Sequence, residues 1–197
     1  MAMAAGSQTD VHAASPRARM PKLLRATWLA VLGMSAFFVA LTLSYFARNR
    51  LTINWLSPHL VDILSANTAL LLASSLALVR GRLFLRANQI QATLRWLIIA
   101  FGFGLSFLIG QAYAWRTLIA AGVYIYDRPN SAFFYLVTAF HAAHLLIGLA
   151  ILSWPLAAAW RGHLRPERRL SLDIASVVWH LLDFTWIYIY LALLLYR

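Results

Sequence analysis

The chain alternates between long apolar stretches and short connections that carry most of its charged residues. Five stretches of about 20 residues each are free of lysine, arginine and glutamate: residues 28–47, 60–79, 96–115, 133–155 and 174–196. A helix needs about 20 apolar residues to cross the ~30 Å hydrocarbon core of a bilayer. The pattern therefore predicts an all-α, polytopic membrane bundle of five transmembrane helices over residues 23–197.

The N-terminal segment differs from the rest of the chain. Residues 1–22 are rich in Ala, Ser, Gln and Thr and show no helical periodicity, so we predict a mobile cytoplasmic tail. The first apolar stretch is too long for the apolar core of a signal peptide, and no small-residue cleavage site follows it. We therefore expect it to remain as the first membrane helix.

The composition excludes several classes of protein. Apolar residues make up 62% of the chain and charged residues 12%, against roughly 45–50% and about 25% in an average soluble domain. A soluble fold and a disordered chain are therefore excluded. There is no cysteine, which excludes disulfides, zinc–thiolate sites, iron–sulfur clusters and thiol nucleophiles.

The basic residues predict an orientation. Twelve of the 17 fall in alternate segments: Arg17, Arg19, Lys22, Arg25, Arg80, Arg82, Arg86, Arg95, Arg161, Arg165, Arg168 and Arg169. The other five are Arg48, Arg50, Arg116, Arg128 and Arg197. Because short cytoplasmic segments carry the excess of Lys and Arg, the N-terminus is predicted in the cytoplasm and the C-terminus outside. Topology explains the net charge of +11, and nucleic acid is not a predicted partner.

Small residues recur every four positions in two of the predicted helices. One stripe is Ser65, Ala69, Ala73 and Ala77, and the other is Gly102, Ser106, Gly110 and Ala114. Small residues at this spacing let helix backbones approach closely in lipid. We therefore predict close helix packing along both stripes, although Ala and Gly are also common in such helices for no special reason.

Four ionisable residues lie inside the predicted bilayer. His141 and His144 are three residues apart on one helix, as are His180 and Asp183 on the next, so each pair shares a helical face. At ~1.5 Å of rise per residue, His144 and Asp183 lie ~16 Å and ~14 Å from the nearest helix ends. Both are near the midplane. We predict that Asp183 hydrogen-bonds to a histidine, with His144 first, and that carbonyls or hydroxyls such as that of Thr138 satisfy the other histidines.

Three interpretations of these four residues remain open. They could ligate haem or a metal, they could form a proton relay or transport site, or they could form a structural network that joins the last two helices. Leu, Ile, Phe and Trp surround them in sequence and leave little space for a cofactor, which favours the network. The sequence shows no phosphate-binding loop, metalloprotease motif or nucleophile elbow. We therefore predict no catalytic, cofactor-binding or metal-binding residue in this chain.

The order of several motifs resembles subunit III of the haem–copper terminal oxidases, the cytochrome c oxidase family. The resemblance is carried by the phenylalanine-rich start of a His-x-x-His helix (Ser131–Gly148) and by Trp-His-x-x-Asp-x-x-Trp (Trp179–Trp186). Asn-Thr-x-x-Leu-Leu-x-Ser-Ser (Asn67–Ser75) and Gln-x-x-x-Trp with a following glycine (Gln111 to Gly122) add to it. Together these motifs span all but the first ~30 residues and the basic loops.

The resemblance implies the short five-helix bacterial form of a non-redox subunit in the cytoplasmic membrane. Such a subunit packs beside subunit I, with subunit II in the same complex, binds phospholipid and supports proton uptake. Haem and copper belong to the partner subunits, which reduce oxygen with electrons from cytochrome c and pump protons. Many members carry a carboxylate near the positions of residues 34–36, where this chain has none. The alternative is a stand-alone b-type cytochrome or a small transporter.

Overall fold

A computed structural model describes residues 16–48, 57–127, 129–166 and 169–195, and in these ranges every regular element is a helix. The helices are α1 (Pro16–Arg48), α2 (Pro58–Arg86), α3 (Ile90–Ala120), α4 (Pro129–Trp160) and α5 (Leu170–Leu195). All five are long and apolar enough to span a membrane. The predicted all-α, multi-pass membrane fold is confirmed.

The helices extend beyond the predicted spans because a helix does not have to end where the hydrocarbon ends. α1 begins at Pro16, so residues 16–22 of the predicted tail are helical, and residues 1–15 lie outside the described ranges. α2 begins at Pro58, where Ser57 caps the helix by accepting a hydrogen bond from the Leu60 backbone N–H at 3.3 Å. Proline fits this first turn because its missing N–H would have no partner there.

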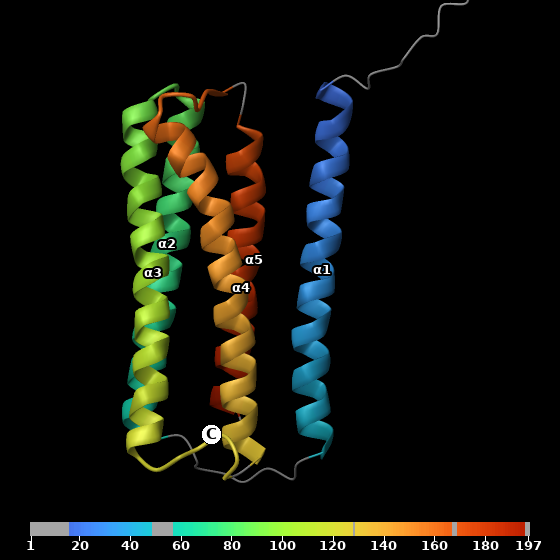
Figure 1. The fold of residues 1–197 in the computed structure, drawn as a ribbon, viewed down its shortest axis with the longest axis vertical. Helices are drawn as coiled ribbons and strands as arrows, with labels where there is room; N and C mark the ends of the chain where they lie inside the picture. Colours follow the sequence, from blue (N-terminus) through green and yellow to red (C-terminus); the bar gives the residue numbers. More distant parts are fainter. Residues whose placement is uncertain (1–15, 49–56, 128, 167–168, 196–197) are drawn as a thin grey trace, which may run out of the picture.

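Helices α2 to α5 form a bundle, and α1 lies to one side of it (Figure 1). The start of α1, the α2–α3 connection and the α4–α5 connection lie at one end of the molecule, at the top of Figure 1. The α3–α4 connection and the end of α5 lie at the other end. Successive helices therefore alternate in direction, which brings the arginine-rich connections to the same end.

α2 and α3 form the most extensive helix pair. The turn between them passes through Asn88, whose φ of 57° is the left-handed conformation that asparagine tolerates better than most residues. The Ser74 hydroxyl donates a hydrogen bond to the Ala100 carbonyl across this pair at 2.7 Å. Gly81 of α2 is also buried against α3, where an added Cβ would lie 3.5 Å from Cβ of Trp96 and 3.6 Å from Cδ2 of Leu97.

The two predicted stripes of small residues are only partly used in this pairing. Of their members, Ala77 and Ala114 are buried, and Gly110 lies against the side chain of Asn67. Ser65, Ala69, Gly102 and Ser106 are exposed in this chain. A strict four-residue spacing drifts around a helix of 3.6 residues per turn, so each stripe leaves the contact line with α2 or α3 partway along.

Two glycines let α5 approach its neighbours closely. A Cβ on Gly104 of α3 would lie 2.6 Å from Cη2 of Trp179, and a Cβ on Gly148 of α4 would lie 2.5 Å from Cδ1 of Leu182. Trp179 is fully buried. The indole of α5 therefore fills the space that glycine leaves between α3 and α4.

α1 contacts the bundle through a few aromatic residues. Phe38 and, one turn further along α1, Thr42 are each 1% exposed. Two turns beyond Phe38, near the C-terminal end of α1, the Tyr45 hydroxyl donates a hydrogen bond to Oδ1 of Asn130 at the start of α4. The ring of Tyr45 also stacks on Phe133 at 4.0 Å between centroids. These contacts join α1 to α4, while α5 forms the larger part of its interface.

Candidate functional site

His141 lies in the centre of the bundle and is surrounded by aromatic rings. Its ring centroid is 5.1 Å from that of Trp186, 5.8 Å from Phe107 and 6.3 Å from Phe38. The side chain is 0% exposed, and neither ring nitrogen has a hydrogen-bond partner among the described residues. The predicted carbonyl or hydroxyl partner for this histidine is therefore wrong.

His144 lies one turn further along α4, and its ring has a hydrogen-bond partner on the backbone of the same helix. Its Nδ1 is 2.7 Å from the Phe140 carbonyl, and its ring lies edge-on to Phe38 with 5.6 Å between centroids. The carbonyl thus takes the place that the sequence analysis expected Asp183 to fill on this histidine. His144 therefore faces α1 rather than α5.

His180 and Asp183 face α2. The His180 Nδ1 is 2.6 Å from the Ser75 hydroxyl and 3.9 Å from Oδ2 of Asp183. Asp183 is 5% exposed, and neither carboxylate oxygen has a hydrogen-bond partner among the described residues. The predicted hydrogen bond between Asp183 and His144 is wrong.

The packing of Trp179 explains why α5 turns its acidic residue away from α4. Trp179, Leu182 and Trp186 are each at most 1% exposed. Trp179 lies at Gly104, and Leu182 lies at Gly148. Asp183 follows Leu182 by one residue, about 100° around the helix, and so points toward Ser75. The four predicted residues thus form two separate pairs: His180 and Asp183 approach each other beside α2, while His141 and His144 both lie edge-on to Phe38 of α1.

Two buried amides were not among the predicted site residues. Asn67 of α2 is 3% exposed and Gln111 of α3 is 1% exposed. The Asn67 Nδ2 and both side-chain polar atoms of Gln111 lack partners among the described residues. The signal was present in the sequence, since both residues occur in the motifs that carried the resemblance. They are uncharged, so a search for ionisable residues passed over them.

Polar contacts between α2 and α5 continue toward both ends of the bundle. At the arginine-rich end, Arg82 Nη2 donates to Oδ1 of Asp173 at 2.8 Å, and both side chains are about 70% buried. Toward the other end, Trp186 Nε1 donates to the Thr68 hydroxyl at 3.0 Å. Such contacts hold two helices in one register.

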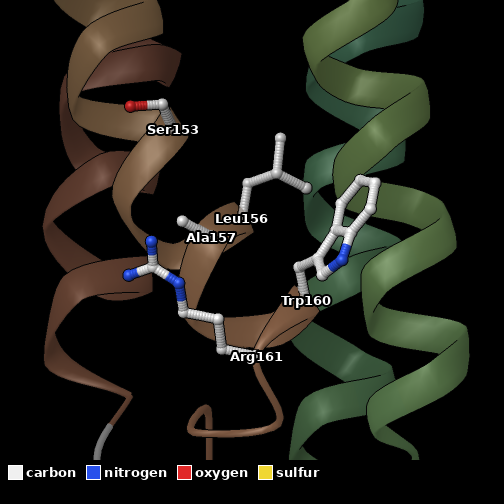
Figure 2. Close-up of a pocket in the computed structure, with 5 residues that line it drawn as sticks. All are labelled: Ser153, Leu156, Ala157, Trp160 and Arg161. Carbon is white, nitrogen blue, oxygen red and sulfur yellow. The ribbon is translucent and has the colours of Figure 1, made fainter.

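The described residues contain no group of three His, Cys, Asp or Glu side chains close enough to hold a metal ion. A groove of about 380 Å³ lies at the arginine-rich end of α4 and is lined by Ser153, Leu156, Ala157, Trp160 and Arg161 (Figure 2). None of the four predicted residues lines it. Apart from Ser153 and Arg161 the lining is apolar, which suits an amphipathic ligand rather than a polar substrate.

The comparisons with known proteins agree with the helices and their buried motifs. The family model described as cytochrome c oxidase subunit III matches residues 28–197, which include all five apolar stretches. The chain belongs to the cytochrome c oxidase subunit III family.

Individual members of the subunit III family match most of the chain. A probable cytochrome c oxidase subunit 3 of Mycobacterium tuberculosis is 31% identical over 166 residues, which cover 82% of this chain and 81% of that protein. A cytochrome c oxidase subunit 3 of Synechocystis is 26% identical over 175 residues, 85% of this chain and 72% of the relative. The alignments thus extend over nearly the whole membrane domain.

Within this family, the motif residues of the present chain have clear places in the fold. Trp179 and Trp186 fill the bundle core, Asp183 is buried next to α2, and His141 is enclosed by aromatic rings. These four motif residues therefore lie inside the bundle, and none of them lines the open groove at the end of α4.

Proposed function

We propose that this chain is a non-redox subunit III of a proton-pumping haem–copper oxidase in a bacterial cytoplasmic membrane. In this proposal it packs against subunit I, in a complex that includes subunit II. The partners reduce oxygen to water with electrons from cytochrome c. The observation that supports the proposal most strongly is the family match over residues 28–197, together with motif residues that lie in helix interfaces.

Native purification tests membership in the complex. A tag at the N-terminus, outside the matched region, should bring down a larger haem-bearing subunit from mild detergent. A second membrane protein carrying the same tag in the same membranes serves as the control. Recovery of the tagged chain alone would favour the stand-alone transporter or cytochrome.

The non-redox role is supported by the surroundings of the histidines. His141 is enclosed by aromatic rings, while one nitrogen each of His144 and His180 contacts Phe140 and Ser75. We expect the separated chain to show protein absorbance only. Methionine at any one of the three histidines should leave the haem content of the complex unchanged. A Soret band that stays with the separated chain would contradict this.

Support of proton uptake is tested by turnover. We expect a complex without this chain to consume oxygen at a normal initial rate and then to inactivate progressively. The reason is that, in this proposal, subunit III supports the uptake of protons into subunit I during oxygen reduction. The readout is oxygen consumption over many turnovers, with and without the chain added back. Equal durability of the two preparations would contradict the proposed role.

We further propose that the groove at the end of α4 binds an anionic phospholipid. Trp160 points toward α2 and α3, while Arg161 lies on the other side of the last turn (Figure 2). Leu156 and Ala157, one turn earlier on α4, also line the groove. A basic residue at the edge of an apolar groove near the membrane surface suits a phosphate group with an acyl chain beneath it. Native mass spectrometry should show Arg161→Gln losing bound anionic lipid, and Trp154→Ala on the same helix keeping it.

The orientation proposed from the arginines is tested by cysteine labelling of a chain that has no cysteine. Exposed positions are needed, and Asn130 and Leu164 are unsuitable because they are 8% and 2% exposed. Tyr126→Cys should react with an impermeant reagent outside intact cells, whereas Ala87→Cys and His163→Cys should be protected. Reaction of His163→Cys with the impermeant reagent outside intact cells would contradict the proposed orientation.

A further inference from the structure

The ring of His180 places a polar nitrogen, Nε2, on the outer surface of the bundle at the depth of the lipid chains. His180 is six residues past the start of the apolar stretch 174–196, which places it ~9 Å inside that stretch. Its side chain is 30% exposed. Nδ1 contacts the Ser75 hydroxyl at 2.6 Å, while Nε2 has no hydrogen-bond partner among the described residues.

The surface around His180 is otherwise apolar. On α2, Leu72, Leu76 and Val79 are 44%, 69% and 40% exposed, and on α5, Leu191 is 51% exposed. These four residues and His180 define the α2–α5 outer face. Acyl chains can cover the apolar side chains of this face, but they offer no hydrogen bond to an imidazole nitrogen. Lipid alone therefore leaves Nε2 unsatisfied.

The alternative occupants fit this face less well. Lipid headgroups lie at the membrane surface, ~15 Å from the midplane of a ~30 Å hydrocarbon core. A second copy of this chain, related by a two-fold axis through the face, would place His180 opposite its own counterpart. The two identical imidazoles would then need different tautomers, although Ser75 and Asp183 surround each of them in the same way.

We propose that the α2–α5 outer face packs against a transmembrane helix of a partner oxidase subunit, and that this helix carries a hydrogen-bonding side chain opposite His180. The inference rests on the proposed function, because it takes a partner in the oxidase complex as given. Apolar residues such as Leu76 and Leu191 supply the packing area. His180 supplies the one polar contact and sets the register of the two helices, as polar residues do between membrane helices.

Photocrosslinking in the whole complex tests the position of this face. A photoreactive amino acid is placed at Leu76 of the outer face and, as a matched control, at Ile109 of α3, which is 64% exposed on another side of the bundle. After illumination of membranes, the Leu76 variant should form a covalent adduct with another oxidase subunit in higher yield than the Ile109 variant. Adducts of the Leu76 variant with lipid only, or with a second copy of this chain, would overturn the inference.

The polar contact is tested by substitution of His180. We expect His180→Leu to weaken retention of the chain on the complex during detergent washing, and His180→Gln to restore part of it, since an amide can still hydrogen-bond. His144→Leu is the control, because the ring nitrogen of His144 contacts its own helix. Equal retention of His180→Leu and wild type would overturn the polar contact.

The two proposals fail in different ways. If the wild-type chain brings down no haem-bearing subunit, the proposed function is wrong. If the subunit is brought down but the Leu76 variant does not crosslink to protein, only the α2–α5 outer face has been misassigned.

Discussion

Gly104 provides the sharpest test of how α5 packs into the bundle. In Gly104→Ala, the added Cβ would lie 2.6 Å and 2.8 Å from Cη2 and Cζ2 of Trp179, and 3.2 Å from Cδ2 of Leu149. Trp179 is 0% exposed and cannot move into lipid. Overpacking of this kind costs ~1–3 kcal/mol, while alanine gains ~1 kcal/mol over glycine in a helix interior. We expect a net loss of ~0–2 kcal/mol.

Gly102, two residues earlier on α3, is the matched control. A Cβ there would meet nothing within 4 Å, so Gly102→Ala should gain up to ~1 kcal/mol from helix propensity. Because both variants carry the same propensity gain, their difference isolates the contact with Trp179. That difference should be ~1–3 kcal/mol.

The assay is an SDS titration of the solubilised chain in which tryptophan fluorescence reports unfolding. It gives the free energy of unfolding of each variant. Trp179→Phe should reduce the cost of Gly104→Ala in the double variant, because the smaller ring removes the atoms that the new Cβ approaches. Equal stability of Gly104→Ala and Gly102→Ala would refute the close packing of Trp179 between α3 and α4.

Three further predictions concern polar groups. The partly exposed Arg82–Asp173 ion pair should contribute only ~0–1 kcal/mol to stability. A double-mutant cycle with Arg82→Gln and Asp173→Asn should give a coupling energy of this size that falls with added salt. A coupling energy several times larger would contradict this prediction. Trp186→Phe and Thr68→Val each remove the same 3.0 Å hydrogen bond. Their losses of stability in the SDS titration should therefore be non-additive by ~0.6 kcal/mol. Strictly additive losses would mean that the hydrogen bond is not formed. His141→Leu removes two buried ring nitrogens that have no hydrogen-bond partner among the described residues. The SDS concentration at the unfolding midpoint should therefore stay unchanged or rise. A clear loss of stability would show that these nitrogens are hydrogen-bonded.

The number and order of the helices were predictable because the requirement behind them is local. An apolar run of about 20 residues spans the hydrocarbon whatever it packs against. The helix ends were less predictable. α3 begins at Ile90 and ends at Ala120, beyond the apolar run 96–115 at both ends, because helical backbone hydrogen bonds form between polar residues as well as between apolar ones.

The candidate site shows a different limit. Helical spacing correctly places His180 and Asp183 on neighbouring turns, and the distance of 3.9 Å between Nδ1 and Oδ2 agrees with it. It does not say which neighbouring helix that face meets. The expected partner, His144, contacts Phe140 instead, because an estimate of depth compares heights in the membrane and contains no information about rotation around the helix axis.

The sequence by itself determined that this protein crosses a membrane five times, and its motifs indicated the subunit III family that the matches to known proteins established. Both follow from features carried along the chain: the length of apolar runs and the spacing of residues on one helix. Only the tertiary structure decided which faces meet. Gly104 and Gly148 admit Trp179 and Leu182 of α5, and this rotation of α5 brings His180 to Ser75. The rotation depends on whether side chains from different helices fit together, which no single helix encodes.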